Sequence, residues 1–143
     1  MASIRDLMTS NIETVRPDQT AREAASFMLS ADTGSIPVCD GERIVGMITD
    51  RDIAVRGVAA GKGPDCSVSD LMSKDVVFAR DDDDAQSVAA KMSEAQVRRL
   101  PVLDENDKLV GMVSLGDLAR DSDGESAHQA LEGVSSPGGQ HEG

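Results

Sequence analysis

The sequence predicts an α+β fold, an α/β sandwich made of two similar halves. The first observation is an internal repeat, because shifting the chain by 64 residues superimposes much of the first half on the second. The second is that short apolar runs alternate with helical patterns in the same order in each half. The third is composition: aromatic residues are only 1% of the chain, so aliphatic side chains and methionine must build the core. A chain of 143 residues is long enough to bury such a core.

Short motifs recur in the same order along the repeat. Asp6-Leu7-Met8 is matched by residues 70–72, and Pro37-Val38 is matched by residues 101–102. The stretch "GMITDRD" from Gly46 is matched by "GMVSLGD" from Gly111, after one extra residue in the turn "DENDK". These matches place repeat 1 at residues 3–62 and repeat 2 at residues 67–121. Residues 122–143 are acidic and rich in glycine and serine, so we expect a disordered tail there.

Each repeat is predicted to have the order helix, strand, helix, strand, strand, helix. Ser3 and Ser67 each precede a short helix and have an aspartate three residues later, which predicts a variant capping box. Apolar residues at roughly alternate positions then predict a strand at 11–16 and another at 75–80.

A longer helix follows in each repeat, capped by Thr20 with Glu23 in the first and by Asp84 in the second. Two strands joined by a turn come next, at 35–39 and 43–49 and again at 100–104 and 108–114. The last helix begins near Asp50 in repeat 1, where Gly61 closes it, and near Gly116 in repeat 2. One repeat has too few apolar residues to cover both faces of its sheet, so we expect the halves to pack through their sheets.

Charge and composition exclude several classes of function. A formal net charge of −12 works against binding to nucleic acid, which needs Lys and Arg to displace counterions from phosphates. The chain has no apolar run of about 18 residues and no apolar leader at its N-terminus, so we expect a cytoplasmic protein without a membrane partner. The only histidines, His128 and His141, lie in the tail, and no Ser-His-Asp or Cys-His constellation is available. The sequence therefore predicts that the protein is not an enzyme.

Cysteines and clustered acids give no metal site. Cys39 and Cys66 are far apart in the sequence and have no nearby histidine, which fits neither a zinc site nor a redox motif. Cys39 lies in an apolar run and is predicted to be buried, while a disulfide with Cys66 stays open. The acids at 81–84 precede a helix, where the helix dipole favours negative charge, so capping explains them better than a metal.

The end of each repeat places a hydroxyl residue and an acid at a strand-to-helix junction. Thr49 and Asp52 stand there in repeat 1, and Ser114 and Asp117 stand there in repeat 2. The first N–H groups of a helix are free to bind an anion, a hydroxyl can donate to phosphate, and a carboxylate can accept from ribose hydroxyls. The pattern therefore suits a nucleotide. The same spacing is also a variant capping box, which duplication would copy equally well.

These motifs resemble those of paired CBS domains (cystathionine-β-synthase domains). The resemblance rests on Asp-Leu-Met near the start of each repeat, on "SIPV" and "RLPV" in the middle, and on the two closing stretches, and it covers about residues 3–121. It implies a pseudo-two-fold pair of domains, each with a small mixed sheet and two helices, and a homodimer of such pairs. It also implies a regulatory or sensor module that binds AMP, ADP or ATP, or S-adenosylmethionine, in the cleft between the repeats and signals to a partner protein.

By position in the motifs, the resemblance implies two nucleotide sites. Thr49 and Ser114 would contact phosphate, and Asp52 and Asp117 would hold ribose. Arg51 would add positive charge to the first site. The base would lie against apolar residues of the mid-repeat strands and of the early strand, which are Ser35, Ile36, Pro37, Val38 and Ile12 in the first site and Leu100, Pro101, Val102 and Val76 in the second.

The two motifs differ beside the phosphate position. Leu115 and Gly116 of the second motif replace Asp50 and Arg51 of the first, so the second lacks an adjacent cation and the first has a repelling acid. We prefer the first motif as the binding site and expect no cofactor to be required. The alternative function is a ligand-free dimeric scaffold or protein-interaction module, in which the hydroxyl–acid pairs are only helix caps.

Overall fold

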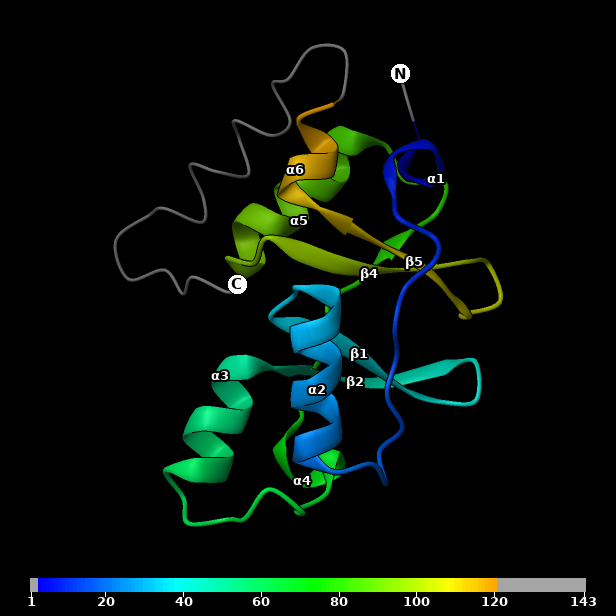
Figure 1. Ribbon diagram of the computed structural model, residues 1–143. Helices are drawn as coiled ribbons and strands as arrows, with labels where there is room; N and C mark the ends of the chain where they lie inside the picture. Colours follow the sequence, from blue (N-terminus) through cyan, green and yellow to red (C-terminus); the bar gives the residue numbers. More distant parts are fainter. Residues whose placement is uncertain (1–2, 121–143) are drawn as a thin grey trace. The chain divides into compact units, whose positions relative to one another are not determined.

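The computed structural model describes residues 3–120, which form two compact units (Figure 1). Unit 1 combines residues 3–12 with residues 77–120, and unit 2 consists of residues 13–76. The units therefore cut across the predicted repeats, because the opening segment of each repeat packs with the rest of the other one. The tail predicted at 122–143 lies outside the described residues.

Unit 2 contains a two-stranded antiparallel sheet flanked by helices. Its elements are α2 (Ala21–Ala31), β1 (Ser35–Asp40), β2 (Arg43–Thr49), α3 (Asp50–Asp52), the π-helix η1 (Ile53–Val58) and α4 (Val68–Leu71). The strand predicted at 11–16 is reduced to a single parallel bridge between Val15 and Val38. The predicted last helix is present, but its larger part is a π-helix, which the sequence pattern does not reveal.

Unit 1 repeats this arrangement with a three-stranded sheet. Its elements are α1 (Ile4–Leu7), β3 (Ala79–Arg80), α5 (Ala85–Ala95), β4 (Arg99–Leu103), β5 (Leu109–Ser114) and α6 (Leu115–Leu118). The strand order is β3-β4-β5, with β3 parallel and β5 antiparallel to β4, so the sheet is mixed as predicted. Of the strand predicted at 75–80, only the last two residues pair.

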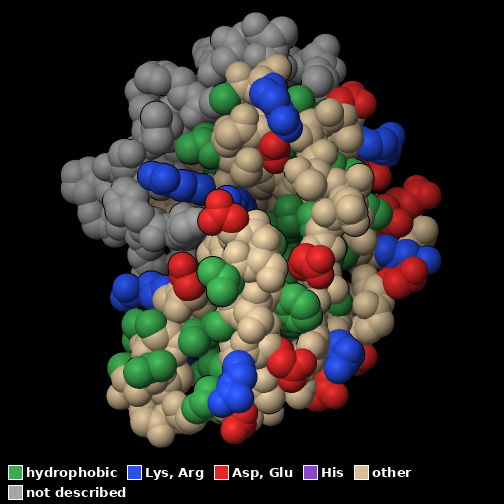
Figure 2. All heavy atoms as spheres, in the orientation of Figure 1, with side chains coloured by type: hydrophobic (Ala, Val, Ile, Leu, Met, Phe, Trp, Pro, Cys, Tyr) green, Lys and Arg blue, Asp and Glu red, His purple; other side chains and the backbone are tan. Residues whose placement is uncertain are grey.

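Each unit has its own aliphatic core. In unit 2, Ala24 and Met28 of α2 pack with Ile48 of β2 and with Val68 and Leu71 of α4. In unit 1, the matching cluster is formed by Ile4, Leu7, Val88, Met92, Leu100 and Val113. On the face shown in Figure 2, further hydrophobic side chains gather over α2 and α3. None of the helices described at 3–120 is long and apolar enough to cross a membrane.

The longer helices begin with the predicted caps, whereas the short ones do not. The Thr20 hydroxyl accepts from the Glu23 N–H at 3.1 Å, and the Glu23 carboxylate accepts from the Thr20 N–H at 3.3 Å. Asp84 accepts from the Ser87 N–H at 2.7 Å. The capping boxes predicted at Ser3 and Ser67 are wrong, because neither side chain makes a capping hydrogen bond. Tertiary packing holds these four-residue helices instead.

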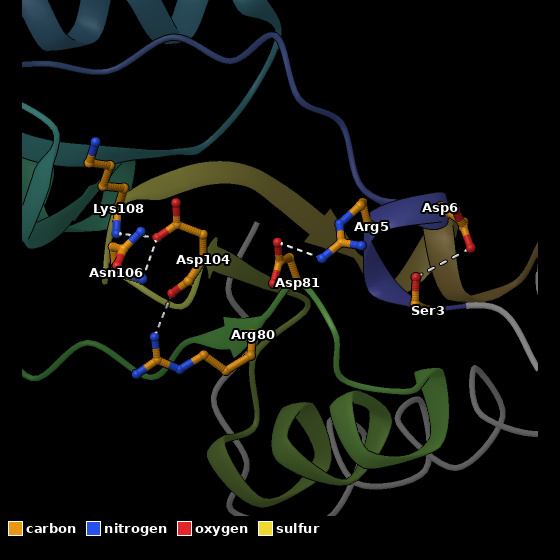
Figure 3. A network of polar contacts seen from close by, with 8 residues as sticks. All are labelled: Ser3, Arg5, Asp6, Arg80, Asp81, Asp104, Asn106 and Lys108. Carbon is orange, nitrogen blue, oxygen red and sulfur yellow. Dashed lines mark hydrogen bonds and ion pairs between the residues drawn. The ribbon is translucent and has the colours of Figure 1, made fainter.

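Acids 81–84 serve the local structure of unit 1 (Figure 3). Asp81 pairs with Arg5 of α1 at 3.0 Å, which raises the pKa of that guanidinium, and Asp83 accepts from the Arg80 N–H at 2.9 Å. In the next turn, the N–H groups of Lys108 and Asn106 lower the pKa of the Asp104 carboxyl. No cluster of potential metal ligands occurs within residues 3–120.

Both cysteines are free thiols, so the disulfide left open by the sequence does not form here. Cys39 is buried as predicted, and burial raises the pKa of its thiol.

The opening segment of each repeat is fixed against a glycine of the sheet. The N–H and C=O of Met47 pair with those of Ser73 at 2.8–2.9 Å, and those of Met112 pair with Thr9 at the same distances. A Cβ at Gly46 would lie 2.7 Å from Met72 Sδ and 2.8 Å from the Ser73 carbonyl oxygen. Gly111 stands in the same relation to Met8 and Thr9. The glycine that recurs in both closing motifs therefore exists to let a second backbone approach.

Substitution of Gly46 by alanine tests this packing. Because the carbonyl of Ser73 is backbone and cannot move aside cheaply, we expect Gly46→Ala to lower the free energy of unfolding by about 1–3 kcal/mol. Urea denaturation measures the change. Gly63→Ala is the matched control, since no atom lies within 4 Å of its Cβ position. Equal stability of the two variants would contradict the close approach.

Candidate functional site

The Thr49 junction, residues 49–52, joins β2 to α3 in unit 2. The Thr49 hydroxyl accepts a hydrogen bond from the Asp52 N–H at 3.0 Å. In return, Asp52 Oδ2 accepts from the Thr49 N–H at 2.9 Å. The two predicted site residues therefore form a complete capping box. Both side chains are half-buried, so they are fixed in position yet remain accessible.

The N–H groups of this junction are already satisfied, which corrects the expectation of a free amide cluster. The Asp50 N–H donates to the Gly34 carbonyl at 2.9 Å, and the Arg51 N–H donates to Asp50 Oδ1 at 2.8 Å. The Asp52 N–H is taken by Thr49, as described above. A phosphate at this position would have to compete with the chain's own carboxylate for the Arg51 N–H.

The Ser114 junction, residues 114–117, repeats this geometry in unit 1. The Ser114 hydroxyl accepts from the Asp117 N–H at 3.1 Å, and Asp117 Oδ2 accepts from the Ser114 N–H at 2.8 Å. The Leu115 N–H donates to the Arg98 carbonyl at 2.7 Å. Leu115 stands where Asp50 does in the Thr49 junction, so this position offers no carboxylate to the Gly116 N–H.

Each capping box leaves one hydroxyl hydrogen and one carboxylate oxygen for a ligand. A threonine or serine hydroxyl that accepts from an amide can still donate its own hydrogen. In the carboxylates, Oδ2 closes the box and Oδ1 faces a cation. Asp52 Oδ1 lies 3.9 Å from Arg56 Nε, whereas Asp117 Oδ1 lies 2.5 Å from Arg120 Nη2. The acid of the Thr49 junction is therefore the less engaged of the two.

Arg56 was not singled out from the sequence. Its guanidinium donates to the carbonyls of Leu71 and Met72 at 3.4 Å, which ties η1 to the end of α4. Its position four residues after Asp52 is a sequence signal that could have indicated the pair.

The predicted apolar wall is largely part of the core. Ile36 and Val38 are buried among α2 and β2 side chains, and Leu100 and Val102 are buried in the core of unit 1. Pro37 and Pro101 alternate with them and point to the opposite face of each sheet. The prolines are therefore the wall residues with side chains on the face away from the core.

Three other predicted residues are placed less centrally. Arg51 is exposed. Ile12 ends its segment of unit 1 and Val76 ends unit 2, so neither belongs to the same unit as the site it was predicted to complete. Ser35 begins β1 opposite Thr49, and its hydroxyl oxygen is shielded from solvent without a hydrogen-bond partner among the described residues. A buried hydroxyl without a partner is the kind of group that a ligand could satisfy.

Comparison with known protein families gives a match in both repeats. The model of the CBS domain matches residues 4–57 and again residues 68–124. The chain belongs to the CBS domain family. The two matches reproduce the tandem arrangement predicted from the repeat, and solved structures with this fold are likewise CBS domain proteins.

Relatives of this CBS domain protein cover nearly its whole length. CBS domain-containing protein YhcV of Bacillus subtilis is 43% identical over 136 residues, which are 94% of this chain and 96% of the relative. The structure of CBSX2 in complex with AMP has a TM-score of 0.73 and 26% identity, and the match covers 84% of this chain and 95% of that one. The CBS domain pair of protein MJ0100, solved with 5′-methylthioadenosine and S-adenosyl-L-methionine, has a TM-score of 0.76 and 26% identity, over 87% and 98%.

Removal of the Thr49 hydroxyl tests the structural half of the site. We expect Thr49→Ala to lower the free energy of unfolding by about 1 kcal/mol, because the Asp52 N–H loses its acceptor. Thr49→Ser keeps the acceptor and should stay close to the parent protein. Chemical denaturation of both variants measures the difference. A Thr49→Ala variant as stable as Thr49→Ser would show that the capping box contributes nothing.

Proposed function

We propose that this protein is a regulatory module that binds an adenine nucleotide at the Thr49 junction and signals the bound state to a partner protein. The observation that carries the proposal is the pair of unused groups at that junction, the Thr49 hydroxyl hydrogen and Asp52 Oδ1. Two related CBS structures contain AMP or adenosine derivatives, which supports the choice of an adenosine compound.

The proposed contacts follow from the chemistry of the free groups. Asp52 Oδ1 accepts from a ribose hydroxyl, and the Thr49 hydroxyl donates to a phosphate oxygen. Arg51 supplies the positive charge that offsets Asp50 beside it. Pro37 and the unpartnered Ser35 hydroxyl flank the base. We place the stronger site here rather than at the Ser114 junction, because Arg120 already holds Asp117 Oδ1 at 2.5 Å.

The second candidate function is a ligand-free scaffold. It is favoured by the N–H groups at the Thr49 junction, which are satisfied without a ligand. In this case the protein would act through docking, as a homodimer with a protein partner in the cytoplasm, and nucleotides would leave its stability unchanged.

Asp52→Asn separates the two functions. Asparagine keeps a carbonyl oxygen for the Thr49 N–H, so the cap survives, but its other group donates and cannot accept from ribose. We expect an AMP affinity lower by about 10–100-fold, because a hydrogen bond to a charged group is worth about 1.5–3 kcal/mol. Isothermal titration with AMP and ATP measures the affinity, and urea denaturation checks that the fold is retained.

Asp18→Asn is the matched control, because Asp18 is exposed and lies outside the junction. Absence of heat with AMP, ATP and S-adenosylmethionine, together with no nucleotide released from gently purified protein on denaturation, would favour the scaffold. Binding that is unchanged in Asp52→Asn would remove the Thr49 junction as the site.

A further inference from the structure

A groove separate from the predicted nucleotide contacts opens on unit 2. It lies between α2 and η1 and has a volume of about 700 Å³. Ligand sites in proteins typically occupy about 300–1,000 Å³ and are mostly apolar. Within residues 13–76 the groove is bounded by Leu29 of α2, by Ile53 and Val58 of η1, and by the glycine-rich segment that follows.

The walls of the groove expose large aliphatic side chains to water. Leu29 is 85% exposed and Val58 is 73% exposed, although both lie on helices whose other side chains form the core. By sequence, the positions equivalent to Leu29 and Val58 in the second repeat are Ser93 and Asp123. The apolar walls are therefore not a requirement of the duplicated fold, and only repeat 1 carries them.

Positive charge is confined to one end of the groove. Arg22, in the first turn of α2, has its N–H bonded to the Pro64 carbonyl at 3.0 Å, and Lys62 stands two residues before that proline. Leu29 lies about 10 Å further along α2, at 1.5 Å per residue. No acid lines the groove, although the chain carries 26 acidic residues. Asp65 meets Arg22 only at 4.0 Å, in an exposed pair of little strength.

The cationic end is also open. Gly61 and Gly63 line it, and no atom lies within 4 Å of the position that a Cβ would take at either residue. A compact head group can therefore reach Arg22 and Lys62, while the apolar walls continue from there toward Leu29.

We propose that this groove binds a small amphiphile, with an anionic head group at Arg22 and Lys62 and an alkyl chain lying between α2 and η1. Charge decides between this ligand and a second copy of the chain. An isologous contact would present the same lining twice, and that lining contains two cations and no acid. A carboxylate or phosphate head group supplies the missing negative charge, and its alkyl chain covers Leu29 and Val58.

Decanoate and decanol are the probes that test this proposal on the full chain. We expect saturable binding of one decanoate per chain by isothermal titration, and weaker binding of decanol. Leu29→Ser should reduce decanoate affinity at least about tenfold, since it removes an apolar wall. The double variant Arg22→Gln/Lys62→Gln should weaken decanoate and leave decanol unchanged. Leu29, Arg22 and Lys62 are exposed, so these variants are expected to fold.

Val77→Ser is the matched control, because Val77 is 44% exposed and lies on unit 1, outside the groove. It should bind decanoate like the parent protein. Three results would overturn the proposal: no decanoate binding, equal loss in Val77→Ser and Leu29→Ser, or decanoate binding that ignores both cations. A Leu29→Ser variant that dissociates a dimer while the parent ignores decanoate would assign the groove to an interface between copies instead.

Discussion

The fold depends on the close approach of two backbones at Gly46 and at Gly111. At each place a segment from the other repeat forms a pair of hydrogen bonds with the residue after the glycine, at 2.8–2.9 Å. The same segment brings a short helix into the core, α4 in unit 2 and α1 in unit 1. Because any side chain at these glycines would collide with a carbonyl oxygen, the glycine is what allows each unit to complete its core.

This constraint also explains where the candidate site lies. The glycine stands three residues before Thr49 or Ser114, so the docked segment holds the strand immediately before the junction. The capping box then fixes the hydroxyl and the acid on the first turn of the following helix. Cap and ligand contact use different atoms of the same residues, with Oδ2 in the cap and Oδ1 available. A structural and a binding role can therefore coexist, and duplication copies both.

The two units differ where a ligand would meet them. At the junctions, Asp50 and Arg51 are replaced by Leu115 and Gly116, and the partner of the acid changes from a distant Arg56 to a close Arg120. On the helices, Leu29 and Val58 give way to Ser93 and Asp123 in the sequence. The backbone and the caps are common to both repeats, whereas charge and apolar surface are particular to one. Such differences allow one half of a duplicated protein to bind what the other half does not.

The sequence by itself determined the tandem repeat, the α+β class, the strand pairs and the caps at Thr20, Asp84, Thr49 and Ser114, because these follow from local spacing and periodicity. The tertiary structure alone decided which repeat completes which core, since the Asp-Leu-Met segments are nearly identical and could pack at home or away. It also decided that the amides of the Thr49 junction are satisfied and that Ile36 and Val38 face the core. Those facts depend on partners such as Gly34 and Met28, which are distant in the chain, and no local pattern encodes a contact of that kind.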